Sequence, residues 1–265
     1  MMQGDRPATA FDQTGPAGAP VVVLVHGLGL NRAVWQWMVP ALSRHFRVLS
    51  YDLLGHGESP PPAGQPALRD LADQLAALLD HLHIARAAVV GFSLGGMVAR
   101  RFAQDHPDRV WALGLLHTAH RRTASAQAAI QLRVAQAAAH GPAATVEQAL
   151  ERWYTASCRL SRPDLMDLTR AWVLANDPRV YPLFYRILAD GVDEIVAPSP
   201  PISCPALVLT ADEDYGNGPE MSAAIASEIK GARLVILKGL RHMALAEDPG
   251  AVNRPVIDFL TGQSG

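Results

Sequence analysis

Two patterns of apolar residues alternate along most of this chain. Short apolar runs rich in valine and leucine, such as 21–25 and 205–210, are typical of strands that are buried on both faces of a parallel sheet. Between such runs, apolar residues recur at helical spacing, most clearly at Leu71, Leu75 and Leu78, with aspartates largely on the opposite side. Strands that alternate with helices over short connections predict an α/β fold with a doubly wound, mostly parallel sheet.

The predicted elements divide the chain into two parts. Strands are expected at residues 8–14, 21–25, 47–52, 87–91, 110–116, 205–210 and 233–237, and helices at 33–43, 68–82, 219–230 and 249–260, with one more directly after residue 93. The alternation stops near residue 120, and residues 121–200 show Ala-rich helical periodicity with several aromatics. We therefore expect a core formed by residues 1–120 and 201–265, and a helical cap formed by residues 121–200 over the carboxyl ends of the strands.

Composition and charge narrow the class of protein. The chain has 265 residues, 49% of them hydrophobic and 18% charged, which is ordinary for a globular protein with a substantial core. A formal charge of -2 offers no electrostatic footprint for nucleic acid or an anionic membrane, and no apolar run approaches the length of a membrane span. Residues 1–7 lack the apolar block of a secretory signal. We expect a cytoplasmic protein, and the bias towards Arg and Ala indicates a bacterial source.

The two cysteines, Cys158 and Cys204, lie far apart and have no metal-ligand spacing. We therefore expect free thiols, with neither a disulfide nor a metal site.

The candidate chemistry centres on Ser93. An apolar run that ends in Gly91-Phe92-Ser93-Leu94-Gly95 continues directly into residues typical of a helix. Such a short passage from strand to helix requires a sharp turn, which holds the serine in a strained backbone conformation and leaves its hydroxyl exposed. The flanking glycines make room for this turn, and the helix N-terminus favours developing negative charge. The stretch predicts a nucleophile elbow with Ser93 as the nucleophile.

A glycine pair follows the strand at residues 21–25, in His26-Gly27-Leu28-Gly29. A dinucleotide-binding fingerprint would place its third glycine at Arg32, so this interpretation is disfavoured. The alternative is an oxyanion loop, in which the backbone N–H groups of Leu28 and Leu94 stabilise a tetrahedral intermediate. His26 is then expected to be a structural, hydrogen-bonded residue rather than a base.

A serine nucleophile needs a base, and the base needs an acid that orients it. His242 follows the last predicted strand, and acidic residues follow the strand before it. The chain order of serine, acid and histidine is that of the α/β-hydrolase fold.

With these residues in place, the chain resembles the α/β-hydrolases over nearly its whole length. The likeness runs from the oxyanion loop through Asp52-x-x-Gly55-x-Gly57-x-Ser59 and the elbow to Gly239-x-x-His242, and the cap matches least. A serine at position 93 argues against the haloalkane dehalogenases and epoxide hydrolases, which use an aspartate there. The residues around the elbow and His117-Thr118-Ala119 look most like those of 3-oxoadipate enol-lactonases and small carboxylesterases.

The resemblance implies a catalytic acid and a reaction. The family's acid usually stands in a strand-Gly-x-x-Asp pattern; Ala211 replaces the glycine here, which makes Asp214 the match and leaves Asp212 as the second choice. Ser93, His242 and Asp214 would then hydrolyse a small carboxylic ester or lactone through an acyl-enzyme, without a cofactor or metal. The protein is expected to be a monomer or small homo-oligomer.

Several further residues are expected near the substrate. The candidates for the pocket are His26, Gly27, His117, Trp153, Trp172 and Met243, and a cap arginine such as Arg121, Arg133, Arg152 or Arg186 could pair with a substrate carboxylate. Solvation at the surface is the other expectation for each arginine. Two alternatives remain open: hydrolysis of a carbon–carbon bond or perhydrolysis on the same triad, and a ligand-binding receptor without activity.

Overall fold

A single sheet organises residues 9–264, which are the residues that the computed structural model describes. Its seven strands follow the order β1-β3-β2-β4-β5-β6-β7. Only β1 runs antiparallel to its neighbour, and all other pairs are parallel. The mostly parallel α/β fold predicted from the sequence is confirmed. The strands are β1 (Phe11–Thr14), β2 (Val21–Val25), β3 (Arg47–Tyr51), β4 (Ala87–Phe92), β5 (Val110–Leu116), β6 (Ala206–Ala211) and β7 (Arg233–Leu237).

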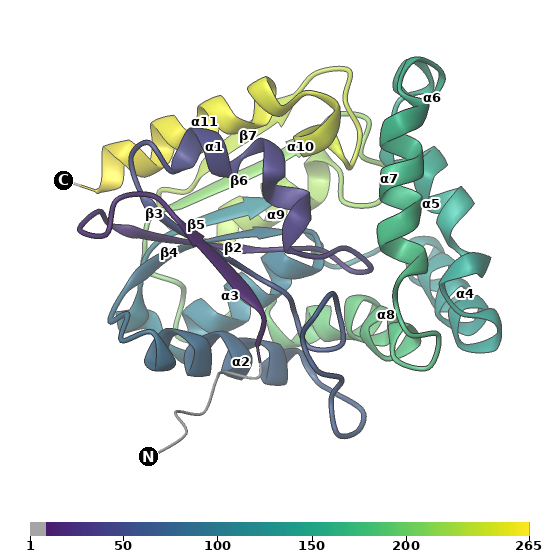
Figure 1. Cartoon of the computed structure of the whole chain (residues 1–265), viewed down its shortest axis with the longest axis horizontal. Helices are drawn as coiled ribbons and strands as arrows, with labels where there is room; N and C mark the ends of the chain where they lie inside the picture. Colours follow the sequence, from purple (N-terminus) through teal and green to yellow (C-terminus); the bar gives the residue numbers. More distant parts are fainter. Residues whose placement is uncertain (1–8, 265) are drawn as a thin grey trace.

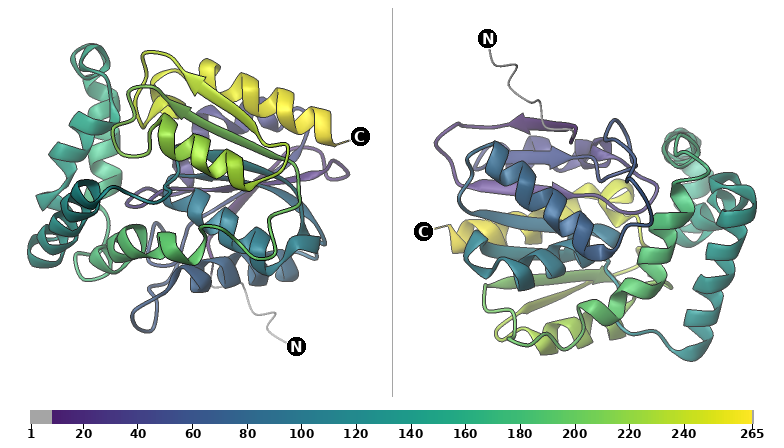
Figure 2. Two further views of the ribbon diagram at one scale, coloured as in Figure 1. Left: turned by 180° about the vertical axis from the view of Figure 1, so that it is seen from behind. Right: turned by 90° about the horizontal axis from the view of Figure 1, so that it is seen from below.

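Helices cover both faces of this sheet (Figures 1 and 2). One face carries α1 (Val39–Leu42), the short α10 (Ala244–Glu247) and α11 (Pro249–Gln263), and the other carries α2 (Leu68–His81), α3 (Leu94–Asp105) and α9 (Pro219–Glu228). Each face buries its own apolar cluster against the central strands. The leucines that repeat at helical spacing in α2 belong to one of these clusters, as an amphipathic helix requires.

The helices of residues 121–200, which we call the cap, lie beside the sheet (Figure 1), and residues 191–200 lead back to the core along α3. The cap contains α4 (Ala124–His140), α5 (Val146–Trp153), α6 (Ala156–Ser161), α7 (Pro163–Leu174) and α8 (Tyr181–Asp190). Residues of α4, α5 and α8 border the same cavity as residues that follow β2 and β4. We keep the division into a core and a cap as a proposal.

One predicted helix is wrong in its extent. The region 33–43 contains a 3-10 helix (η1, Arg32–Trp37) followed by the separate α1. Pro40 stands in the first turn of α1, where its missing N–H is harmless, whereas it could not continue the hydrogen-bond ladder of a preceding helix. Further 3-10 turns are η2 (Pro107–Arg109), η3 (Pro142–Ala144) and η4 (Gly191–Glu194). Cys158 and Cys204 are both free, as predicted.

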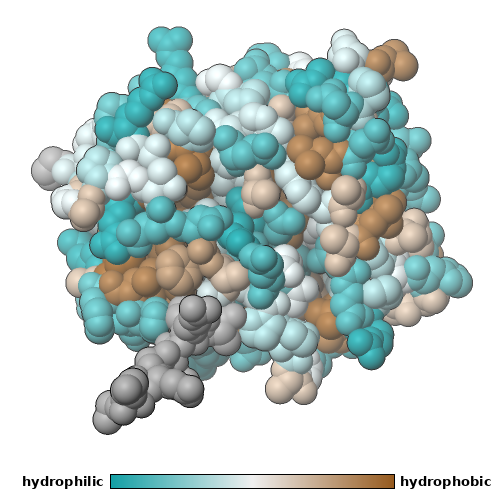
Figure 3. Space-filling view, in the orientation of Figure 1, coloured by the Kyte–Doolittle hydropathy of each residue, from teal (hydrophilic) through white to brown (hydrophobic). Residues whose placement is uncertain are grey.

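The surface has the mixed apolar and hydrophilic composition of an ordinary globular protein (Figure 3). In the view of Figure 3, apolar residues form separate patches between hydrophilic ones. No helix in the described part of the chain is both long and apolar enough to cross a membrane. The prediction about a secretory signal concerns residues 1–7, which lie outside the described residues.

Candidate active site

Ser93 stands at the sharp turn that the sequence predicts. β4 ends at Phe92, α3 begins at Leu94, and Ser93 between them adopts φ 56° and ψ -116°. A positive φ is costly for a residue with a Cβ, so the surrounding structure must hold it. Both backbone polar groups of Ser93 form hydrogen bonds. Its N–H donates to the carbonyl of Leu116 (2.9 Å), and its carbonyl accepts from the Thr118 hydroxyl (2.8 Å).

The two glycines that flank the serine allow this turn to form. A Cβ on Gly91 would lie 2.1 Å from the carbonyl oxygen of Gly95, and a Cβ on Gly95 would lie 2.0 Å from that of Val25. Both clashes involve backbone atoms, which cannot move aside cheaply. The glycines therefore let α3 approach the sheet closely enough for Ser93 to reach the carboxyl edge.

His242 and Asp214 form a buried hydrogen-bonded pair. The two atoms His242 Nδ1 and Asp214 Oδ2 are 2.8 Å apart, and both residues are buried. Asp214 follows β6 and His242 follows β7, so adjacent parallel strands deliver them to the same edge of the sheet. The second-choice acid, Asp212, is exposed, and its carboxylate accepts from the N–H of Gly239 instead. The geometry therefore favours Asp214 as the partner of His242.

The Asp214 carboxylate receives four hydrogen bonds. Its Oδ2 atom accepts from His242 and from His117 Nδ1 (2.9 Å), and its Oδ1 atom accepts from the backbone N–H groups of Gly216 (3.1 Å) and Asn217 (3.0 Å). Burial acts to raise the pKa of this carboxyl, but the two histidines outweigh burial and hold the pKa below its ordinary value. Asp214 is thus a fixed anion beneath the imidazole of His242.

His117 is the residue in this network whose role the sequence did not predict. It follows β5, has φ 49°, and is completely buried. Burial lowers its pKa more strongly than Asp214 raises it, so the ring is neutral and its Nδ1–H donates to Asp214. Its Nε2 atom is buried and has no partner among the described residues. His117 therefore holds Asp214 from behind and does not face a substrate.

Two backbone N–H groups next to Ser93 have no acceptor. Neither Leu28 nor Leu94 donates its N–H to any group within residues 9–264. The Gly27 position lies close to the serine, since a Cβ placed there would be 3.1 Å from Ser93 Cβ. Leu94 is the first residue of α3, where N–H groups are free by the nature of a helix start. The pair has the composition of an oxyanion hole.

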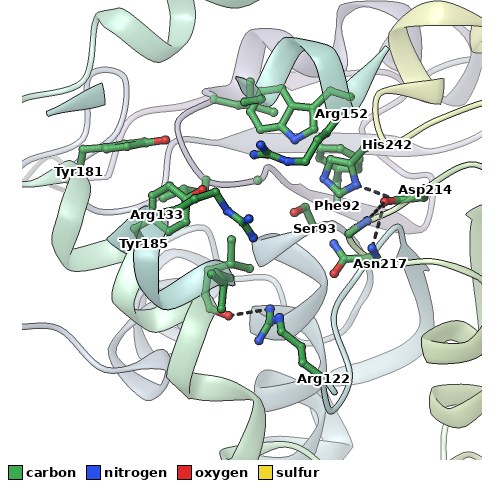
Figure 4. A pocket seen from close by; sticks show the side chains of 18 residues that line it. Phe92, Ser93, Arg122, Arg133, Arg152, Tyr181, Tyr185, Asp214, Asn217 and His242 are labelled. Atoms are coloured by element: carbon green, nitrogen blue, oxygen red, sulfur yellow. Dashed lines mark hydrogen bonds and ion pairs between the residues drawn. The ribbon is translucent and has the colours of Figure 1, made fainter. Parts of the chain in front are cut away.

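A single cavity joins these residues to the cap (Figure 4). The close-up shows Ser93 and His242 bordering this space, with Asp214 behind His242. From the core, the cavity is lined by Gly27, Leu28, Leu30, Phe92, Ser93, Asp214, Gly216, Asn217 and His242; from the cap, by Arg122, Ile130, Arg133, Ala149, Arg152, Trp153, Tyr181, Tyr185 and Leu188.

The predicted pocket residues divide into two groups. Gly27 and Trp153 line the cavity, and the Trp153 ring centroid lies 6.0 Å from that of His242. The expectation for His26, His117, Trp172 and Met243 needs correction, because none of them is among the lining residues in the described chain.

His117 is buried against Asp214, and packing explains the positions of the other three. His26 is fully buried, its Nε2 accepts from the N–H of Leu53 (2.9 Å), and burial lowers its pKa to about 4, so it is the structural residue expected as the alternative to a base. Trp172 packs against Trp37, and Met243 is completely buried in the core.

The cap contributes three arginines to the cavity. Arg133 and Arg152 had been named as candidates for pairing with a carboxylate, whereas Arg122 had not. Arg121 and Arg186, the other two candidates, are exposed and outside the lining. The sequence identified only two of these three arginines, because the face of a helix that points into a cavity depends on how the helix packs against the rest of the protein.

A metal could in principle use the same side chains as the hydrogen-bonded network. His117, Asp214 and His242 offer ligand atoms that lie within 4.8 Å of one another. However, a divalent ion needs deprotonated ligands at about 2.0–2.2 Å, and the closest atoms here pair with each other at hydrogen-bond lengths. The arrangement fits a proton relay, and we assign no metal to it.

Comparisons with known proteins agree with this geometry. Residues 20–249 match the family described as alpha/beta hydrolase fold. An Acinetobacter baylyi protein named (E)-2-((N-methylformamido)methylene)succinate hydrolase is 29% identical, with 98% of this chain and 96% of that protein covered. A 3-oxoadipate enol-lactonase of the same organism is 26% identical over 91% and 89% of the two chains. The crystal structure of an enol-lactonase from Burkholderia xenovorans superimposes with a TM-score of 0.88 at 31% identity, over 96% of each chain.

Proposed function

The chain belongs to the alpha/beta hydrolase fold family, and from this premise we propose that it is a serine hydrolase that cleaves a carboxylic ester or lactone through an acyl-enzyme. One observation carries the proposal: a strained serine and a buried histidine–aspartate pair border one cavity. The names of the relatives, an enol-lactonase and a succinate-derivative hydrolase, support hydrolysis as the reaction class.

In the proposed first step, the Ser93 hydroxyl attacks the substrate carbonyl while His242 Nε2 accepts its proton. The Nδ1–H of His242 stays directed at Asp214, whose negative charge stabilises the imidazolium that forms. The N–H groups of Leu28 and Leu94 would stabilise the oxyanion of the tetrahedral intermediate. His242 then returns the proton to the leaving oxygen, and the alcohol departs.

The second step regenerates the serine. Water attacks the acyl-enzyme and loses its proton to His242, the carbon–oxygen bond to Ser93 breaks, and the serine oxygen recovers the proton. For a lactone, the leaving oxygen stays attached to the acyl group, so one product is released instead of two. The cap forms the roof of the cavity, and we propose that it determines which acyl groups fit.

The test compares Ser93→Ala with the unsubstituted protein on a panel of aryl esters and lactones. We expect kcat/KM to fall by roughly 10⁴-fold or more, because loss of a triad nucleophile leaves only binding and oxyanion stabilisation. Ser227→Ala is the matched control, since Ser227 is exposed on α9 and is not among the residues that line the cavity in the described chain. Undiminished hydrolysis by Ser93→Ala would refute the proposal.

A further inference from the structure

Three arginines of the cap surround one side of the cavity. Arg122 precedes α4, Arg133 lies within α4, and Arg152 is in the last turn of α5. In Figure 4 their guanidinium groups extend from separate segments towards the space in front of Ser93. Three cations on one wall of a small cavity require an explanation, because like charges in partly buried positions repel each other.

The nearby acidic side chains do not pair with these cations, since Asp190 and Glu151 act on Arg122 and Arg152 only at longer range. Within residues 9–264, none of the three arginines forms an ion pair with Asp or Glu. Asp214 is the one carboxylate among the lining residues, and its two oxygens are already committed to four donors. The cavity therefore carries an excess of positive charge opposite the serine.

The three arginines differ in how they are held. Arg122 donates to the carbonyls of Leu188 (2.9 Å) and Ala189 (3.2 Å), which fixes it against α8. Arg133 and Arg152 donate no hydrogen bond to any group in the described part of the chain, and the Nε atom of Arg133 is buried without a partner. A buried donor without an acceptor is costly, so an anion that accepts from Arg133 would remove this cost. Arg152 likewise has guanidinium donors that no protein group in the described chain uses.

Electrostatics point the same way. Burial, helped by the neighbouring charge of Arg133 and opposed by Asp190 and Tyr185, lowers the pKa of Arg122 to about 10. Burial likewise lowers the pKa of Arg152, and Arg133 again contributes in the same direction. An anion placed among the three would relieve this repulsion. A guanidinium group carries its positive charge at neutral pH, so the attraction of this wall for an anion persists under ordinary conditions.

Building on the proposed hydrolase function, we propose that the substrate is a small ester or lactone with two carboxylate groups, and that Arg133 and Arg152 each bind one of them. The planar guanidinium can bind a carboxylate through two parallel hydrogen bonds, which suits this role. The two guanidinium groups come from different helices, α4 and α5, and each offers a place for one carboxylate. Arg122 supplies a third, fixed positive charge beside the pair.

Binding of unreactive dicarboxylates tests this inference separately from catalysis. In Ser93→Ala, isothermal titration calorimetry measures the affinity for succinate and glutarate against butyrate and neutral dimethyl succinate. We expect the dicarboxylates to bind at least about tenfold more tightly than butyrate, and dimethyl succinate to bind no better than butyrate. Adding Arg133→Gln or Arg152→Gln should each reduce the dicarboxylate affinity by about tenfold or more. Equal affinity for the dicarboxylates and butyrate would overturn the inference.

Two controls guard against a general effect of charge or folding. Arg186→Gln removes the same charge from an exposed position on the cap and should leave dicarboxylate affinity unchanged; an equal loss there would contradict a specific site. If Arg133→Gln or Arg152→Gln does not fold, the salt dependence of ligand affinity in Ser93→Ala tests the charged site instead. Dicarboxylate binding should weaken with added sodium chloride more steeply than butyrate binding, and equal slopes would count against the site.

The two proposals can fail independently. If dicarboxylates bind as expected but Ser93→Ala still hydrolyses esters, the charged subsite stands and the proposed chemistry is wrong. If Ser93→Ala is inactive but shows no preference for dicarboxylates, the chemistry stands and the subsite is wrong.

Discussion

The core wall and the cap wall of the cavity differ in how their polar groups are satisfied. On the core wall, the Asp214 carboxylate accepts four hydrogen bonds, and His242 is oriented by one of them. On the cap wall, Arg133 and Arg152 have no protein partner within residues 9–264. The hydrogen bonds of Asp214 are complete without a ligand, and only the Leu28 and Leu94 N–H groups of the core wall have no acceptor in the described chain. The two cap arginines, by contrast, have no partner at all among these residues. We therefore propose that the core carries the chemistry and that the cap selects the substrate.

The largest expected effect comes from removing the charge at the centre of the core wall. Asp214→Asn should lower kcat by roughly 10⁴-fold, because an amide cannot hold His242 in the correct tautomer or stabilise its charged form. Asp212→Asn is the matched control, since that exposed carboxylate bonds Gly239 and not His242. Steady-state kinetics on one aryl ester would compare them. The reverse order of losses would assign the acid to Asp212.

The junction between the two regions offers the next test. Arg100 on α3 is completely buried and pairs with Glu228 at 2.7 Å, while the other Glu228 oxygen binds His120 (2.9 Å) and the N–H of Ala197 (2.9 Å). Residues 120 and 197 stand where the chain enters and leaves the cap, so Glu228 fastens both connections to the core.

Glu228→Ala should therefore lower the free energy of unfolding by about 3–5 kcal/mol, because it leaves a buried guanidinium unpaired. Glu147→Ala, which removes an exposed partner of Arg170, should cost only about 0–1 kcal/mol. Urea unfolding of both variants measures the difference. Similar small losses would show that the junction does not depend on this pair.

Buried histidines of the core predict a pH dependence that the cap wall does not share. Burial lowers the pKa of His26 from 6.5 to about 4 and that of His56 to about 3, and the two rings lie 5.2 Å apart. Both are neutral in the folded state, so the unfolded chain binds more protons below pH 6.5, and stability falls as the pH drops from 6.5 towards 4.

Each of these histidines should cost about 2 kcal/mol of stability between neutral pH and pH 5. His56→Phe preserves the edge contact with Phe184, whose ring lies 4.8 Å away, and removes one titrating group. Urea unfolding across this pH range should show a shallower slope for the variant by about one proton. Identical slopes would mean that His56 does not titrate in this way.

The smallest expected effect concerns the residue behind Asp214. His117→Phe removes the Nδ1–H donor but sacrifices no other hydrogen bond of the ring except a long contact with Thr210, since the Nε2 atom has no partner among the described residues. We expect kcat to fall roughly ten- to a hundredfold, with KM nearly unchanged, because one charge-assisted hydrogen bond to Asp214 is lost. A rise in KM with constant kcat would instead indicate contact with the substrate.

The same contrast explains what could be predicted from the sequence. The elbow at Ser93 was readable because the turn imposes a local requirement, glycines at 91 and 95, that leaves a fixed spacing. His117 was misjudged because its contact with Asp214 depends on β5 lying beside β6, a long-range pairing that no local pattern displays. The pairing of β5 with β6 thus determines that His117 contacts Asp214.

The cap was harder for a different reason. The buried residues of α4, Ile130, Val134 and Ala137, lie on one face, but alanines and the exposed Leu132 occupy the other faces as well, so the apolar residues in the sequence do not mark one face clearly. The sequence could therefore name Arg133 as a candidate without separating it from exposed arginines such as Arg121. Whether a helical arginine faces a cavity is decided by tertiary packing and not by the periodicity of the helix itself.

Detection of the acyl-enzyme tests the central claim most directly. An aryl ester reaction quenched in acid and digested should yield, by mass spectrometry, one peptide heavier by the acyl group, with the modification at Ser93. The adduct should be absent from Ser93→Ala and accumulate in Asp214→Asn only as slowly as its turnover allows. An acyl group found on another residue, or steady hydrolysis by Ser93→Ala, would contradict the account.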